Sequence, residues 1–126
     1  MSRLWILVVD DQEPVRDLIA DILVAEGHYV RTAENGVDAL RLLGEQGYDV
    51  ILGDMMMPEM DGQQLYGEIA SRWPPIAARM VFLTAQAGEP NIAALLGRSG
   101  TRVVKKPFSV AELRTALEHA QGPGAA

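Results

Sequence analysis

Five short apolar runs alternate with segments of helical periodicity along the chain. Three of the runs are almost wholly apolar and rich in Val, Ile and Leu, the composition of strands that are covered on both faces. The runs are Leu4–Val9, Tyr29–Thr32, Val50–Gly53, Met80–Leu83 and Arg102–Val104. Their alternation with helical segments predicts five strands of one sheet, each followed by a helix.

The first and last helices carry the clearest signals. From Val15 onward, apolar residues recur at i, i+3, i+4, i+7 and i+8, which places them on one helix face. Pro14 suits the first helical position of this segment, and Gly27 suits its end. Ser109 and Glu112 form a Ser-x-x-Glu capping box, which predicts the start of the last helix.

Three further helices are predicted between these two, at Asn35–Gln46, Gly62–Arg72 and Glu89–Leu96. The second of them is closed by Trp73-Pro74-Pro75. Strand followed by helix, five times over, implies parallel strands joined by right-handed crossovers. At this chain length we expect an open, doubly wound α/β sheet rather than an eight-stranded barrel.

The chain of 126 residues suits one domain and is too short for two ordinary ones. Hydrophobic residues make up 48% of it, which is enough for a buried core. We expect the domain to cover residues 1–120. Residues 121–126 are expected to be a flexible tail, because Gly-Pro-Gly-Ala-Ala carries no periodic pattern.

Charge and composition exclude several classes of function. A net charge of −6 argues against direct binding of nucleic acid, which needs a basic patch. The absence of cysteine excludes disulfides and thiolate metal sites. No apolar stretch approaches the roughly 20 residues that a membrane span needs. We therefore expect a cytoplasmic protein without membrane insertion.

Polar side chains collect where the predicted strands end. Asp10 and Asp11 follow the first run, Asp54 follows the third, and Thr84 follows the fourth. Lys105 and Lys106, the only lysines in the chain, follow the fifth. Ligands of open α/β sheets bind outside the carboxyl ends of the strands, so these residues are the candidate site.

Three carboxylates at one edge repel each other. Two unit charges about 4 Å apart interact by roughly 4 kcal/mol at an effective dielectric constant of about 20, so three pairs approach an upper bound on the order of 10 kcal/mol. A cation, a lysine or proton uptake must offset this repulsion. Hard oxygen donors without His or Cys favour Mg²⁺, which keeps open positions for water and phosphate.

A structural alternative exists for each acidic residue. Aspartates that follow strands often cap the next helix, and for Asp10 and Asp11 capping stays as good an explanation as chemistry. Asp54 does not directly precede a helix, which weakens that explanation there. Asp61, just before Gly62, is interpreted only as a cap or turn residue.

Taken in order, these motifs resemble the receiver domains of response regulators in two-component signalling. The resemblance covers about Leu4 to Ala120. The motifs that carry it are Val8-Val9-Asp10-Asp11, Asp54 followed by Met57-Pro58 and Asp61-Gly62, Leu83-Thr84-Ala85, and Lys106-Pro107-Phe108. It implies a flavodoxin-like (βα)5 fold with strand order 2-1-3-4-5.

The resemblance also implies a role for each candidate residue. Asp54 would accept a phosphoryl group from a histidine of a partner. Asp11, Asp54 and the backbone carbonyl of Met56 would ligate Mg²⁺ or Mn²⁺, and Asp10 would orient metal-bound water. Lys106 would contact the phosphoryl oxygens.

Thr84 would hydrogen-bond one of these oxygens, and the bond between Lys106 and Pro107 would be cis, as in relatives. The implied partners are a histidine kinase or a histidine phosphotransfer protein, with a downstream effector. The implied activity is self-phosphorylation from phosphohistidine and slow self-dephosphorylation, so we expect a signalling phosphoprotein and not an enzyme with a separate substrate.

The sequence departs from the family at one position. Many receivers carry Tyr or Phe three residues before the lysine, where the ring rotates inward on activation. Here that position is Val103, which has no ring. Two alternatives to a phosphorylated module remain open: a pseudo-receiver that only binds other proteins, and a receiver that belongs to a hybrid histidine kinase.

Overall fold

The protein is represented by a computed structural model, which describes residues 3–85, 90, 94 and 102–120. The helix predicted at Glu89–Leu96 falls almost wholly outside the described residues. The tail at 121–126 lies outside them as well.

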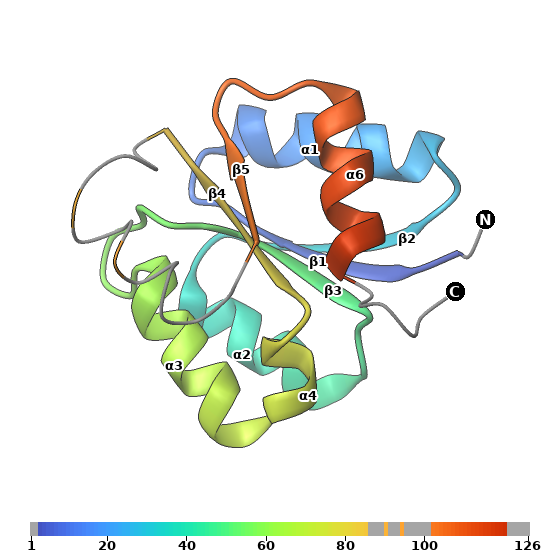
Figure 1. Ribbon diagram of the computed structural model, residues 1–126. Coiled ribbons are helices and arrows are strands. Elements are labelled where there is room, and N and C mark those ends of the chain that lie inside the picture. The colour runs from blue at the N-terminus through green and yellow to red at the C-terminus, as the bar shows by residue number, and fades with distance from the viewer. Residues whose placement is uncertain (1–2, 86–89, 91–93, 95–101, 121–126) are drawn as a thin grey trace.

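One parallel sheet of five strands forms the centre of the molecule, in the order β2-β1-β3-β4-β5 (Figure 1). The strands are β1 (Trp5–Val9), β2 (Tyr29–Ala33), β3 (Val50–Asp54), β4 (Met80–Thr84) and β5 (Arg102–Lys105). All neighbouring pairs are parallel. The expected doubly wound α/β fold and its implied strand order are confirmed.

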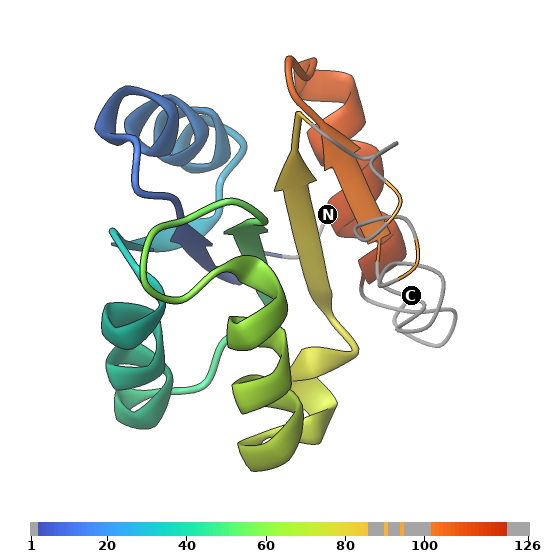
Figure 2. The same cartoon turned by 90° about the vertical axis from the view of Figure 1, so that its left-hand side faces the viewer.

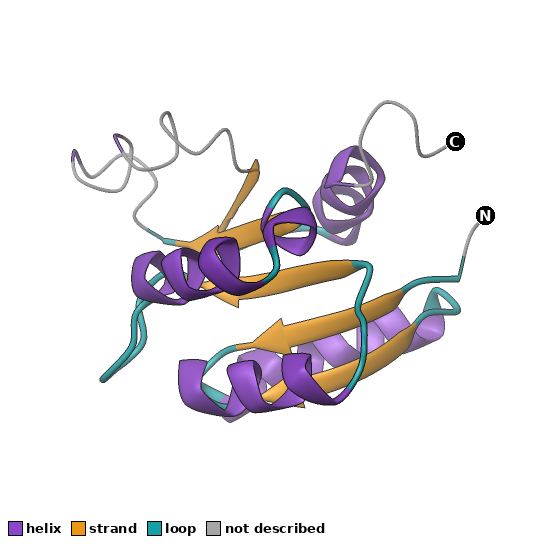
Figure 3. Ribbon diagram, turned by 90° about the horizontal axis from the view of Figure 1, so that it is seen from below, coloured by secondary structure: helices purple, strands orange, loops and turns teal. Residues whose placement is uncertain are grey.

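Helices cover both faces of this sheet. The helices are α1 (Glu13–Ala25), α2 (Gly36–Glu45), α3 (Gly62–Arg72), α4 (Pro74–Ala77) and α6 (Val110–Ala120). In Figure 1, and again in the turned view of Figure 2, α1 and α6 lie on one side of the sheet and α2, α3 and α4 on the other. The view from below in Figure 3 shows the same three layers.

Two hydrophobic clusters fill the spaces between the layers. On the side of α2 and α3, Leu7, Ile51 and Phe82 are fully buried. On the side of α1 and α6, Ile6, Leu52 and Leu83 are fully buried. Successive residues of one strand thus point into different clusters, which is why the central strands are apolar until their last residues.

The ends of the helices follow the local signals in the sequence. Gly27 has φ of 95° and donates its N–H to the carbonyl of Val24, while His28 donates to that of Leu23. This pair of bonds is a Schellman motif that ends α1. Ser109 and Glu112 make both hydrogen bonds of the predicted capping box, at 3.1 and 3.2 Å.

A second capping box begins α3. The Asp61 carboxylate accepts from the N–H of Gln64 at 2.8 Å, and the Gln64 side chain accepts from the N–H of Asp61 at 3.0 Å. The interpretation of Asp61 as a cap is confirmed. The observed bounds of α3, Gly62–Arg72, agree with the prediction.

Several predictions of element bounds need correction. The residues Trp73-Pro74-Pro75 do not only close α3, because Pro74 begins the short helix α4. Proline is tolerated in the first helical turn, where its missing N–H has no partner to lose. In addition, β1 begins one residue later than its apolar run, at Trp5. The other four strands each end one residue later than their runs, at Ala33, Asp54, Thr84 and Lys105.

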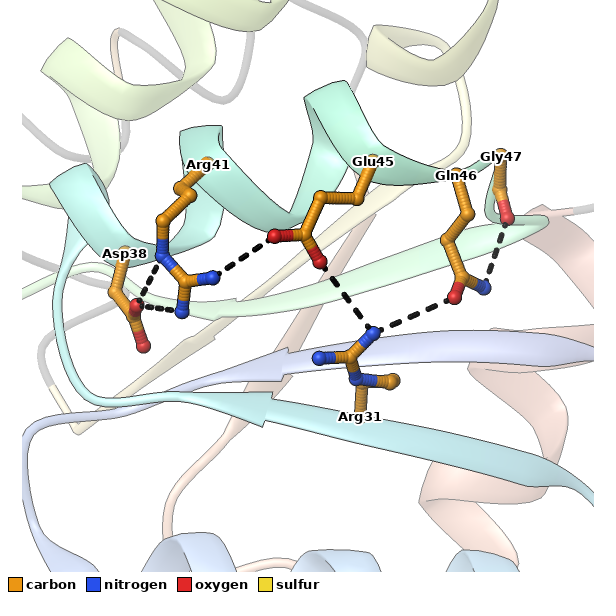
Figure 4. Close-up of polar contacts among 6 residues, drawn as sticks. All are labelled: Arg31, Asp38, Arg41, Glu45, Gln46 and Gly47. Carbon is orange, nitrogen blue, oxygen red and sulfur yellow. Dashed lines mark hydrogen bonds and ion pairs between the residues drawn. The ribbon is translucent and has the colours of Figure 1, made fainter.

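A polar network joins α2 to the outer strand β2 (Figure 4). Arg41 pairs with Asp38 at 2.6 Å and with Glu45 at 2.9 Å along the helix. Arg31 of β2 reaches Glu45 at 3.7 Å and Gln46 at 3.5 Å. These side chains are largely exposed, so each pair contributes little stability.

Candidate functional site

The acidic residues from two strand ends meet at the carboxyl edge of the sheet. β1 and β3 are neighbours in the sheet, so Asp10 and Asp11 after β1 lie beside Asp54 at the end of β3. One oxygen of each carboxylate lies within 4.8 Å of the others. Asp10 and Asp54 are buried, whereas Asp11 is exposed. The predicted gathering of three carboxylates is present.

Lys106 brings the opposite charge to this cluster. Its Nζ lies 3.0 Å from Oδ2 of Asp10 and 3.5 Å from Oδ1 of Asp54. The Lys106 N–H donates to the carbonyl of Thr84 at 2.9 Å, which fixes the segment after β5 against the end of β4. Lys105 is exposed. Lys106 rather than Lys105 thus reaches the carboxylates, and its bond to Pro107 is cis, as the resemblance implies.

The capping explanation for Asp10 and Asp11 is wrong. The N-cap of α1 is Gln12, and its side chain makes no capping hydrogen bond with the described residues. Asp10 instead accepts the N–H of Gln12 through Oδ1 at 2.9 Å. This bond within a turn holds the Asp10 side chain in place and leaves Oδ2 for Lys106.

The surroundings of Asp54 disfavour its charge. Burial, followed by the nearby carboxylate of Asp10, raises the pKa of Asp54 from 3.8 to about 6. The ammonium of Lys106 and the N–H of Met56, which donates to Oδ1 at 3.2 Å, oppose the rise. Asp54 is thus a buried carboxyl group that additional positive charge would stabilise in its ionised form.

A cleft of about 210 Å³ opens over this group. Its lining residues are Asp11, Gln12, Asp54, Met56, Ala85 and Lys106. Of the other predicted site residues, Thr84 is fully buried at the end of β4, one residue beyond the partner of Asp54 in the strand register. A small group that enters the cleft would meet Asp54 and Lys106 together.

The backbone after Asp54 is held by a close contact with the start of α3. The N–H of Gly62 donates to the carbonyl of Met55 at 2.9 Å. A Cβ at Gly62 would lie 2.8 Å from the Cα of Met55 and 2.9 Å from the carbonyl oxygen of Asp54. Only glycine permits this approach, which positions Asp54 and the residues that follow it.

Two contacts of the site were not foreseen from the sequence. Gln12 lines the cleft, and the guanidinium of Arg16 donates to the backbone carbonyl of Asp10 at 2.9 Å. Both depend on how the first turn of α1 leaves β1. Neither residue belongs to a motif or ends a strand, so no signal in the sequence distinguishes them from ordinary helix residues.

The donor set fits a hard divalent cation. It consists of carboxylate oxygens without sulfur or imidazole ligands, which suits Mg²⁺ or Mn²⁺. Lys106 alone offers one positive charge against three carboxylates. The residues therefore fit a divalent ion that would add the missing positive charge.

A parallel sheet in the order 2-1-3-4-5, with an acidic cluster and a lysine at its carboxyl edge, defines a receiver-like α/β fold. Residues 6–118 match the family model of the response regulator receiver domain. The chain belongs to this family, and receiver domains of response regulators are signalling modules rather than conventional enzymes.

Individual relatives agree with this assignment. The chain is 33% identical over 115 residues to the transcriptional regulatory protein GlrR of Escherichia coli, which covers 91% of this chain and 26% of the relative. The solved receiver domain of NtrX from Brucella abortus is 32% identical, with a TM-score of 0.83 and coverage of 92% and 97%.

The chemotaxis protein CheY4 of Vibrio cholerae has a TM-score of 0.82 at 25% identity, with coverage of 94% of this chain and 99% of that chain. The chain thus matches whole receiver domains along their length. It spans about a quarter of the length of the curated relatives it matches. Within the described residues, none of the helices has the length and apolar character that crossing a membrane requires.

Proposed function

We propose that this chain accepts a phosphoryl group on Asp54 from the phosphohistidine of a partner histidine kinase or histidine phosphotransfer protein. The observation that carries the proposal is the buried Asp54 carboxylate, placed in a cleft beside Asp11 and 3.5 Å from the ammonium of Lys106. Aspartates with raised pKa values and specific charge partners are typical of functional sites.

The reaction needs position and charge more than covalent assistance. A carboxylate oxygen of Asp54 attacks phosphorus while the bond from phosphorus to the donor nitrogen breaks, and the electron pair stays on the imidazole. Lys106 contacts the phosphoryl oxygens and offsets their charge. Thr84 holds one of these oxygens by a hydrogen bond from its hydroxyl.

A divalent ion supplies positive charge for the transferring group when it is bound. Asp11, Asp54 and the backbone carbonyl of Met56 would hold it, and Asp10 lies beside them. Buried Asp10 keeps its contact with Lys106, so the lysine remains directed into the cleft. The phosphorylated state then serves as a signal to a downstream effector.

Val103 bears on how that signal is transmitted. It is partly buried and packs against the cluster on the side of α2 and α3. A valine cannot move between an exposed and a buried position as an aromatic ring does. In this chain the signal therefore rests on the segment around Thr84 and Lys106 rather than on rotation of a ring.

The proposal is tested by incubating the protein with acetyl phosphate and measuring its intact mass. The wild type is expected to gain one phosphoryl group in the presence of Mg²⁺ and none in excess EDTA. Asp54→Asn is expected to gain none, because the amide removes the attacking oxygen.

Asp61→Asn is the matched control, since asparagine caps a helix as well as aspartate does and Asp61 lies outside the cleft. It is expected to gain the phosphoryl group as the wild type does. Equal uptake by Asp54→Asn and the wild type would refute the role of Asp54. No uptake by the wild type would favour a module that only binds proteins.

A further inference from the structure

Three consecutive methionines follow Asp54, and they differ sharply in exposure. Met56 exposes 53% of its surface, whereas Met55 exposes 3% and Met57 exposes 8%. The next methionine, Met60, is partly buried and packs close to Gly36, and Met80 is buried in the core. Among the methionines that the structure describes, Met56 alone is an exposed residue.

Met56 is also part of the phosphoryl cleft. It lines this cleft together with Asp54 and Lys106. Its N–H donates to Oδ1 of Asp54 at 3.2 Å, so its backbone is tied to the carboxylate that reacts. A chemical change at this side chain therefore occurs at the entrance of the site and not on a distant surface.

We propose that Met56 is an oxidation-sensitive modification site that controls phosphoryl acceptance by Asp54. The proposal rests on the function proposed above, since it concerns the regulation of the same cleft. The oxidant is hydrogen peroxide, which reaches an exposed methionine more readily than a buried one.

The chemical step is a transfer of one oxygen atom. A lone pair of the Met56 sulfur attacks one peroxide oxygen, an S–O bond forms and the O–O bond breaks. The second oxygen takes up the remaining proton and leaves as water. Sulfur loses two electrons and the peroxide gains them, so the product is methionine sulfoxide and one molecule of water. Methionine sulfoxide reductases reverse the change.

The sulfoxide changes what the cleft presents to an incoming phosphoryl group. Oxidation converts a flexible apolar side chain into a polar one with a strong hydrogen-bond acceptor. That acceptor would lie at a rim that already holds Asp11 and Asp54, near the ammonium of Lys106. It competes for the positive charge that the phosphoryl oxygens need, so acceptance is expected to become slower.

The test treats the full chain with hydrogen peroxide and locates the added oxygen by peptide mass spectrometry. Phosphoryl uptake from acetyl phosphate with Mg²⁺ is then compared with that of the untreated sample of the same variant. The variants are Met56→Leu and, as the matched control, Met60→Leu. Leucine keeps the apolar volume of methionine but has no sulfur to oxidise.

We expect Met56 to be oxidised before the other mapped methionines. Peroxide should slow phosphoryl uptake several-fold in the wild type and in Met60→Leu. Treated Met56→Leu should take up the phosphoryl group as fast as untreated Met56→Leu. Treatment of the oxidised wild type with methionine sulfoxide reductase should restore the rate. This recovery distinguishes a local modification from damage to the fold.

Preferential oxidation of Met60, or equal slowing of Met56→Leu and the wild type, would overturn the proposal. An unchanged rate in wild type that carries the sulfoxide at Met56 would overturn it as well, while leaving the function of Asp54 intact. If the untreated wild type takes up no phosphoryl group, the proposed function fails and this inference fails with it.

Discussion

Asp54 is 5% exposed, and burial together with the charge of Asp10 raises the pKa of its carboxyl from 3.8 to about 6. The folded protein therefore binds a proton at Asp54 more tightly than the unfolded chain does. Between about pH 4 and pH 6 the folded state is protonated where the unfolded state is not. The free energy of unfolding consequently falls as the pH rises through this window. The whole loss of stability that comes from ionising Asp54 is reached above about pH 6.

This cost predicts that Asp54→Asn stabilises the protein. The shift of roughly two pKa units corresponds to about 3 kcal/mol, so the free energy of unfolding should rise by up to that amount at pH 7 without divalent ions. The gain should shrink toward pH 4. Urea denaturation at a series of pH values measures it.

Added Mg²⁺ provides the control for this experiment. It should reduce the difference in stability between the wild type and Asp54→Asn, because the ion offsets the charge that burial disfavours. A difference that is independent of pH, or a mutant that is less stable at pH 7, would contradict the account of Asp54.

At this scale the sequence predicted which charged side chains gather at the sheet edge, but not how they contact each other. The rule that ligands bind at the carboxyl ends of parallel strands brought Asp10, Asp54 and Lys106 together correctly. It could not show that Lys106 lies nearer to Asp10 than to Asp54. That preference depends on side-chain rotamers and on the turn that ends at Gln12, which only the folded backbone defines.

At the scale of elements, the connection from β3 to α3 links the fold to the site. The capping box of Asp61 and Gln64 determines where α3 begins. Gly62 then contacts the backbone of Met55 and Asp54 too closely for any side chain. The position of the Asp54 carboxylate is thus coupled to the start of a helix that lies outside the cleft.

Substitution of two glycines in α3 tests this coupling. Gly62→Ala is expected to cost about 1 to 3 kcal/mol and to slow phosphoryl uptake, because the new methyl group meets rigid backbone. Gly67→Ala is the control. Nothing lies within 4 Å of its added Cβ, and a helix interior favours alanine over glycine by about 0.5 to 1 kcal/mol.

Thermal unfolding and uptake from acetyl phosphate should therefore distinguish the two variants, because only Gly62→Ala is expected to lose stability and to react more slowly. Gly67→Ala should be at least as stable as the wild type and react at the same rate. If Gly62→Ala matches the wild type in both measurements, the contact does not position Asp54.

Elements were predicted from periodicity and caps, and their errors have physical causes. The bounds of α3 and the capping box of α6 were predicted correctly, because side chains determine them locally. The last strand residues Asp54, Thr84 and Lys105 were missed, since pairing with a neighbouring strand extends the ladder past the last apolar residue. The helix α4 was missed because a proline such as Pro74 can mark either the end of one helix or the first residue of the next.

At the scale of the whole molecule, the sheet brings residues far apart in sequence to one edge. Asp10 and Lys106 are separated by 96 positions, yet their side chains lie 3.0 Å apart. Alternation of strands and helices predicted the class of fold, whereas the strand order came from the resemblance to receivers. Periodicity does not determine the order of the strands in the sheet, because a crossover can place the next strand on either side of the preceding one.

The most direct measurement identifies the aspartate that carries the phosphoryl group. The protein is phosphorylated by a phosphohistidine donor with Mg²⁺ and reduced with borohydride, which converts an aspartyl phosphate to homoserine, and its peptides are sequenced by mass spectrometry. The account predicts homoserine at position 54 and unchanged Asp10 and Asp11. Homoserine at position 10 or 11, or at none of the three in a protein that has gained a phosphoryl group, would contradict it.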